Sequence, residues 1–217
     1  MVLMSVVALF KGIQLLKKNN PLQLFNFLLA ASLIDSFTYL ILFIILKKNT
    51  FYWNISPILQ SFYLFIELTT FTIFYFNYFK NDLLKKIVSL IYVFFLIGTF
   101  VSILLGKNPF TEHYTFFVII EILVVNISSI YIFKNVLNSD NLIIKKDIYL
   151  ISKGIFIFIN ITAPYYIISD FLEAKFGKEK IYLNDMSIVE AFNSINDIGY
   201  IILFYFIYKA FKWTKYK

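Results

Sequence analysis

The chain has 217 residues, of which 60% are hydrophobic, 21% are aromatic and 15% are charged, and its mean hydropathy is +0.76. A soluble domain of average composition is about 45–50% apolar and about 25% charged. Because about 30% of the surface of a soluble fold of this size stays in water, the charged residues are too few to cover it. This composition excludes an ordinary water-soluble fold and predicts an integral membrane protein.

The net charge of +7 comes from twenty basic residues, all of them lysines. The lysines lie at the edges of apolar blocks, which is typical of membrane topology signals. A basic stripe on one face, as nucleic-acid binding requires, is missing. The chain has no cysteine, which excludes disulfides, thiolate metal sites and cysteine nucleophiles. We therefore expect the lipid bilayer as a partner and no nucleic acid.

The apolar residues fall in blocks, and about 20 residues of helix are needed to cross about 30 Å of hydrocarbon. In chain order the blocks are approximately 2–16, 22–46, 57–79, 87–105, 114–137, 148–172 and 188–211. The first block is short and contains Lys11, and a polar stop ending at Pro21 follows it. It lacks the positive start and the cleavage site of a signal peptide. We predict a bundle of seven transmembrane helices, with six as the alternative.

The lysines also indicate an orientation for this bundle. With the N-terminus outside, twelve lysines fall in cytoplasmic segments and six in outside segments. This bias predicts an N-out, C-in protein of the bacterial inner membrane. The connecting segments are short, and the longest, around Glu173–Met186, is expected outside. We interpret residues 1–217 as one transmembrane domain.

Five carboxylates inside the predicted spans are candidate site residues, because an ionisable side chain there costs several kcal/mol by insertion scales. They are Asp35, Glu67, Glu121, Glu190 and Asp197. Counting the helical rise from the predicted boundaries places Asp35, Glu67 and Asp197 near the midplane. The same count places Glu121 and Glu190 nearer the outer surface. Because hydrocarbon would not tolerate these groups separately, we predict that they share a hydrated interior.

The last span carries the clearest polar pattern. Glu190, Asn193 and Asp197 lie at i, i+3 and i+7, so they share one face of the helix. A polar stripe in a transmembrane helix must face the bundle or a wet cavity. We therefore expect this stripe to point into the bundle.

Three other polar residues are candidates to line the same interior, Asn126 in the fifth span and Asn160 and Thr162 in the sixth. Pro164 is expected to kink the sixth helix and free a backbone carbonyl. One interpretation is a carboxylate pocket that binds a cation, a proton or a cationic head group. The other is that these groups only join helices through hydrogen bonds, which contribute about 0.6 kcal/mol each in membranes. The sequence leaves both interpretations open.

Rare and missing residues argue against several classes of protein. His113 is the only histidine, whereas a zinc hydrolase needs several protein ligands. No serine lies in a Gly-x-Ser-x-Gly turn. The last span has no lysine before Lys209 to hold retinal. We expect no catalytic residues, no bound metal and no cofactor.

Three short motifs stand out in the first three blocks. They are LLKKNNPL at 15–22, LID at 33–35 and FIE at 65–67. Together they resemble a group of small, stand-alone seven-helix membrane proteins of Bacteroidota, which begin with a short helix and a Lys-Pro hinge. The resemblance implies the fold and the topology, and it supplies no chemistry because the group has no known activity. Members often carry a histidine in the last helix, where this chain has Asn193.

These observations lead to three functional hypotheses. The first is a non-enzymatic protein that binds a small ligand or lipid in its polar core and acts as a sensor or accessory subunit of a partner protein or in a homo-oligomer. The second is a transporter or channel component with a proton or cation relay through Asp35, Glu67 and Asp197. The third, a lipid-modifying enzyme, ranks last because histidine is scarce and arginine is missing.

Overall fold

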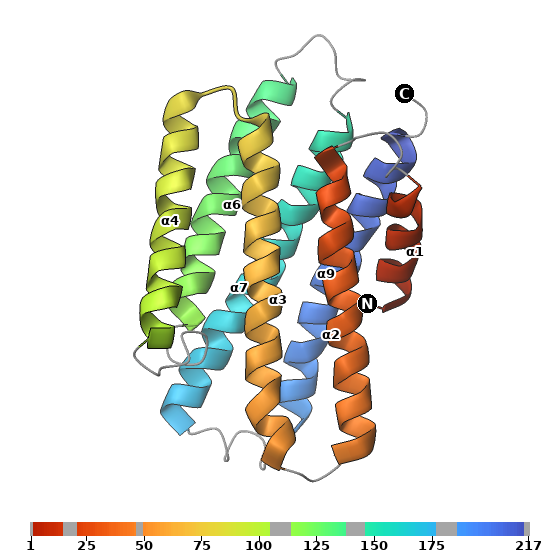
Figure 1. Ribbon diagram of the computed structural model, residues 1–217, viewed down its shortest axis with the longest axis vertical. Helices are drawn as coiled ribbons and strands as arrows, with labels where there is room; N and C mark the ends of the chain where they lie inside the picture. The colour runs from red at the N-terminus through yellow and green to blue at the C-terminus, as the bar shows by residue number, and fades with distance from the viewer. Residues whose placement is uncertain are drawn as a thin grey trace.

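The computed structural model of the protein describes residues 2–14, 21–46, 50–104, 114–137, 146–176 and 186–214. This part of the chain contains seven α-helices, one short 3-10 helix and no strand, so the all-α prediction is confirmed (Figure 1). The elements are α1 (Val2–Ile13), η2 (Pro21–Gln23), α2 (Leu24–Leu46), α3 (Thr50–Tyr78), α4 (Asp82–Leu104), α6 (Tyr114–Leu137), α7 (Lys146–Phe176) and α9 (Met186–Thr214). Each predicted apolar block falls largely on one of the seven α-helices.

Local signals account for several helix ends. Pro21 opens the 3-10 turn that leads into α2, because its fixed φ suits the start of a helix. Asn81 caps α4, where its Oδ1 accepts hydrogen bonds from the backbone N–H groups of Leu83 at 2.9 Å and Leu84 at 3.3 Å. The α3–α4 turn is tied to α6 because the Lys80 N–H donates to the Tyr131 hydroxyl at 3.2 Å.

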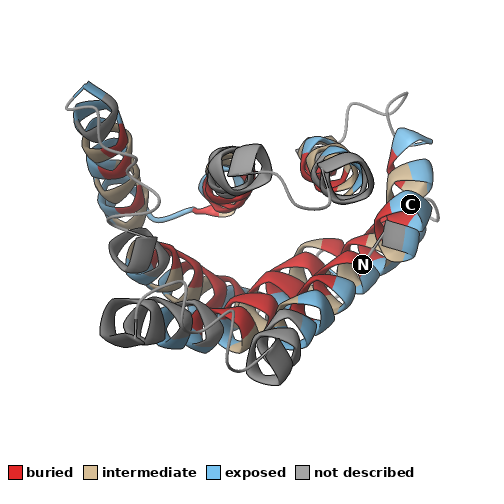
Figure 2. Cartoon of the chain, turned by 90° about the horizontal axis from the view of Figure 1, so that it is seen from below, coloured by how far each residue is buried: buried red, intermediate tan, exposed pale blue. Residues whose placement is uncertain are grey.

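The helices alternate in direction, and each α-helix packs beside the next one along the chain (Figure 1). The short α1 packs against both α2 and α9, so the arrangement closes into a ring. Seen from below, α2 and α3 face a layer formed by α6, α7 and α9, with α4 and α1 at opposite edges (Figure 2). The α7–α9 seam is the most extensive interface, and α3 also contacts α6 across the ring.

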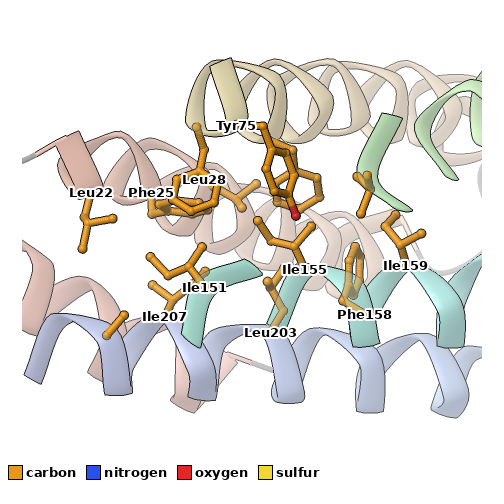
Figure 3. Packing of buried hydrophobic residues seen from close by; sticks show 14 of the residues in the cluster. Leu22, Phe25, Leu28, Tyr75, Ile151, Ile155, Phe158, Ile159, Leu203 and Ile207 are labelled. Atoms are coloured by element: carbon orange, nitrogen blue, oxygen red, sulfur yellow. The ribbon is translucent and has the colours of Figure 1, made fainter. Parts of the chain in front are cut away.

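The hydrophobic core fills the space between the two layers. Leu28 of α2, Tyr75 of α3, Ile155 of α7 and Leu203 of α9 are fully buried and converge there (Figure 3). Aromatic rings stack edge to face in the same core, which adds directional packing to the buried area. The core therefore joins elements from both ends of the sequence.

Two glycines let α7 and α9 approach closely. A Cβ added to Gly154 would lie 2.6 Å from the Cβ of Phe206, and one added to Gly199 would lie 2.5 Å from the Cγ2 of Thr162. Any side chain at either glycine would push the helices apart. Small residues thus set the spacing of this seam, as is common between membrane helices.

Small side chains also form the buried face of α1. Ser5, Ala8 and Gly12 lie at i, i+3 and i+7 and are buried. A Cβ on Gly12 would meet the side chains of Asn26 in α2 and Phe211 in α9. The first apolar block, although short, is therefore a packed part of the bundle.

Within the described residues, two helices contain a segment long and apolar enough to cross a membrane. These segments are Asp82–Val101 in α4 and Lys146–Pro164 in α7, and shorter apolar stretches occur at Leu3–Ile13 and Leu24–Thr38. These two segments do not test the other five predicted membrane spans, so seven spans stay a prediction.

Large apolar side chains are exposed on the outer surface of every α-helix. One example from each, in chain order, is Phe10, Phe27, Phe76, Phe94, Leu123, Ile168 and Ile198. The buried residues face the inside of the bundle and the exposed ones face outward (Figure 2). Both the inside and the outside of this bundle are therefore apolar.

Candidate functional site

Two acidic side chains lie buried together inside the bundle, Glu67 of α3 and Glu121 of α6. Glu67 is 1% exposed and Glu121 is 5% exposed. They come from the two helices that touch across the ring, and their carboxyl groups are close enough to interact electrostatically. We refer to Glu67 and Glu121 as the carboxyl pair.

Tyr200 of α9 fixes one half of the carboxyl pair. Its hydroxyl donates a hydrogen bond of 2.8 Å to Glu67 Oε2, and the tyrosine is itself buried. The Tyr200 ring packs against Phe158 of α7, with 4.6 Å between ring centroids, and against Tyr63 of α3, at 5.7 Å. Aromatic packing on two sides holds the donor in place, so one carboxyl oxygen has a preset partner.

Hydrogen bonding is incomplete at Glu121, the other member of the pair. Oε1 of Glu121 is buried and has no hydrogen-bond partner among the described residues. A buried polar atom without a partner carries a desolvation penalty of about 1–3 kcal/mol, and more if it is charged. Two buried carboxylates within range of each other also repel strongly in a low-dielectric interior. The pair is therefore suited to hold a proton or a cation between its two members.

A second buried polar group lies between the carboxyl pair and the end of the bundle that carries Lys80, Lys134 and Lys146, which we call the lysine-rich end. The Tyr75 hydroxyl and Ser129 Oγ are hydrogen-bonded at 2.5 Å, and Ser128 and Ser152 are fully buried as well. Tyr75 follows Glu67 by eight residues, which is about 12 Å along α3. We refer to Tyr75 and Ser129, with Ser152 close by, as the Tyr75 cluster.

The structure does not bring Asp197 into this interior. Its side chain is exposed, whereas Gly199 and Tyr200 on the same helix are buried. At Asp197 the structure therefore differs from the expectation that the stripe of the last span points into the bundle, although Tyr200, three residues later, is buried. The side chains of Asp35, Glu190 and Asn193 lie outside the described residues, as does His113.

Three predicted supporting residues have different placements. Asn160 Nδ2 donates to Asn126 Oδ1 at 2.8 Å and so joins α7 to α6, but Asn160 is exposed, which corrects the interior position expected for it. Thr162 is buried, and its hydroxyl donates to the carbonyl of Phe158 at 3.0 Å. Pro164 lies within α7, which continues to Phe176.

Sequence reasoning missed the tyrosines that complete the site. Tyr200 follows Asn193 by seven residues, so extending the polar stripe of the last span by one turn would have reached it. No comparable signal marks Tyr75, because it is one of 16 tyrosines and lies in an aromatic stretch of α3. Its role depends on Ser129, which is 54 residues away in the sequence.

The chemistry available to the site follows from these placements. No group of three His, Cys, Asp or Glu side chains lies together in the parts of the helices that the structure describes, so the site offers two carboxyl groups and one phenol. The fold and the site define an all-α bundle with a carboxyl pair at its centre. The chain matches no protein-family model, no curated protein and no solved structure.

Proposed function

We propose that this protein is a multi-pass inner-membrane protein in which all seven α-helices lie in the bilayer. The exposed apolar side chains on every helix support this proposal, because water would make each of them unfavourable by about 25 cal/mol per Å². The segment Asp82–Val101 gives the strongest support, since it is highly apolar and only 17% of it is buried inside the bundle. Lipid would cover this surface.

The proposed orientation, N-out and C-in, is supported by the lysines. Lys80, Lys134, Lys146 and Lys209 are exposed near the ends of α3, α6, α7 and α9 that lie on one side of the bundle (Figure 1). Cytoplasmic segments of membrane proteins are enriched in lysine. We therefore place the lysine-rich end in the cytoplasm.

At the centre of the bundle, we propose that the carboxyl pair binds a proton or a small cation, including the cationic group of a small ligand. The burial of Glu67 and Glu121 within range of electrostatic interaction carries this proposal. Two such groups cannot both remain charged in an apolar interior unless a positive charge lies between them. Tyr200 occupies one oxygen of Glu67, which leaves Oε1 of Glu121 for the bound species.

The role that fits this site best is a non-enzymatic sensor or accessory subunit. A proton or cation bound between α3 and α6 changes the repulsion between two helices on opposite sides of the ring. Their relative position then reports occupancy at the lysine-rich end, where a partner protein or a second copy binds. Such a coupling requires only that the two states of the pair differ in their contacts.

Infrared difference spectroscopy on the protein in lipid nanodiscs tests the site. Adding Na⁺, K⁺ or tetramethylammonium at constant pH is expected to change the C=O stretching band of protonated carboxyl groups. Glu121→Gln should remove this change. Asp197→Asn is the matched control, because Asp197 is an exposed carboxyl group in the same bundle and should leave the band unaffected. A band change that persists in the Glu67→Gln/Glu121→Gln double variant would contradict the proposal.

Transport of protons or cations is the second candidate function, and the Tyr75 cluster favours it. The cluster supplies buried hydroxyl groups on the cytoplasmic side of the carboxyl pair, as a proton relay requires. In liposomes with an imposed membrane potential, Glu67→Gln and Tyr75→Phe should each lower the flux measured with a pH-sensitive dye. Tyr92→Phe serves as the control, since Tyr92 bonds to Thr69 on the α4 side of α3. Equal flux in all four proteins would exclude this candidate.

A further inference from the structure

The outer surface of the α7–α9 seam carries three exposed lysines near the cytoplasmic end of the proposed topology. Lys146 and Lys153 of α7 lie at i and i+7 and thus on one face, and Lys209 lies on the adjoining helix α9. Lys153 is seven residues, about 10 Å, further along α7 than Lys146. The lysines therefore cover a range of depths and do not form a single ring at the helix ends.

Aromatic rings of α9 support these lysines. Lys146 Nζ lies 3.9 Å from the centroid of the Trp213 ring, and Lys153 Nζ lies 5.8 Å from that of Phe206. Both contacts cross the seam from α7 to α9. Lys209 Nζ lies 4.7 Å from the ring of Tyr205. Cation–π contacts of this kind hold the ammonium groups close to the protein surface.

The charge of this surface is positive because the neighbouring acid turns inward. Asp147 is next to Lys146 in sequence but is only 7% exposed. Its carboxylate accepts a hydrogen bond from the Ile148 N–H at 3.0 Å and lies 3.5 Å from the Thr214 hydroxyl. The two sides of this turn of α7 thus separate the charges, with the acid inside and the ammonium groups outside.

An apolar stripe continues from the lysines toward the middle of the bundle. Ile198, Ile201 and Tyr205 are exposed on α9 and lie on the same face as Lys209, at intervals of three and four residues. A ligand with an anionic head and apolar chains would match both parts of this surface. Free phosphate or an acidic protein segment would match only the lysines.

We propose that the α7–α9 seam binds an anionic phospholipid, with its phosphate between Lys146, Lys153 and Lys209 and its acyl chains along Ile201 and Ile198. This inference rests on the membrane location given under the proposed function and adds a specific lipid site to it. Each lysine near an anionic surface contributes a factor of about five in affinity.

Quenching of Trp213 fluorescence by brominated lipids tests the site. A Trp53→Phe background leaves Trp213 as the only tryptophan, since the chain has two. The protein is placed in vesicles of equal parts phosphatidylglycerol and phosphatidylcholine, with bromine on one lipid or the other. We expect brominated phosphatidylglycerol to quench Trp213 severalfold more than its share of the bilayer predicts. Lys146→Gln/Lys153→Gln/Lys209→Gln should reduce this excess to the bulk value.

A matched triple variant distinguishes a specific phospholipid site from general attraction of anionic lipid to surface lysines. Lys80→Gln/Lys86→Gln/Lys134→Gln removes the same charge from exposed lysines on other helices at the same end and should keep the excess quenching. Equal quenching by both lipids, or an equal loss in both triple variants, would overturn the lipid site while leaving the membrane location intact. In the first case the lysines would remain available to an acidic protein segment. Quenching by neither lipid would overturn the membrane location itself.

Discussion

The helices α4 and α7 both contain a segment able to cross a membrane, yet they have opposite surroundings. The segment of α4, Asp82–Val101, is the more apolar of the two, and 17% of it is buried by protein, against 50% of Lys146–Pro164 in α7. In a water-soluble protein the more apolar helix would be the more buried one. This reversal supports the proposal that the apolar side chains of α4 contact lipid, whereas those of α7 pack inside the bundle.

The glycines of the two helices differ in the same way. Gly154 of α7 lies against Phe206, whereas a Cβ on Gly98 of α4 would meet no atom of the described residues within 4 Å. Contacts between α4 and its neighbours are few compared with those at the α7–α9 seam. Three pairs of substitutions test whether this contrast reflects two environments.

The largest expected effect comes from a cavity in the packed helix. Ile155→Ala removes methyl groups from a fully buried side chain of α7, and we expect the free energy of unfolding to fall by about 2–5 kcal/mol. Ile97→Ala on α4 removes the same groups from a side chain that is 53% exposed, so its effect should stay below about 1 kcal/mol. Unfolding by sodium dodecyl sulfate in mixed micelles measures the free energy of unfolding of both variants. Equal losses would show that the two side chains lie in similar environments.

A charge placed on the outer face of α4 distinguishes lipid from water. Ile97→Lys puts a lysine near the middle of the helix, and we expect a cost of membrane insertion of about 3 kcal/mol. Leu83→Lys, on an exposed residue at the lysine-rich end, should cost little because the lysine can reach the head groups. The fraction retained in membranes after alkaline extraction reports the difference. Full retention of the Ile97→Lys protein would mean that this face of α4 lies in water.

The smallest effect, and the one with opposite signs in the two helices, concerns the glycines. Gly154→Ala must separate α7 from Phe206, so we expect it to lower the free energy of unfolding by about 1–3 kcal/mol. Gly98→Ala has open space and improves helix propensity, so it should raise that free energy by up to about 1 kcal/mol. Thermal unfolding in detergent compares the two, and a loss at Gly98 would show that α4 is packed against something on that side.

The candidate site was only partly predictable from sequence. The rarity of charged residues inside apolar blocks identifies Glu67 and Glu121 as candidates, and both are buried. Counting along each helix predicts different depths for the two groups, because it treats the helices as parallel to one another. Asp197 also lies inside an apolar block, yet its side chain is exposed. The tyrosine that bonds to Glu67 lies 133 residues away, beyond the reach of any local pattern.

The sequence by itself determined where the helices lie, because long apolar runs, Pro21 and the polar segments between blocks act locally on the backbone. It also determined which chemical groups lie inside these runs. Only the tertiary structure decided that Glu67 bonds to Tyr200 and interacts with Glu121, that Asp197 is exposed and that Lys146 lies over the Trp213 ring. The physical reason is that helical periodicity fixes the rise of a residue and its angle within one helix. How each helix is rotated against its neighbours depends on packing between residues far apart in the chain.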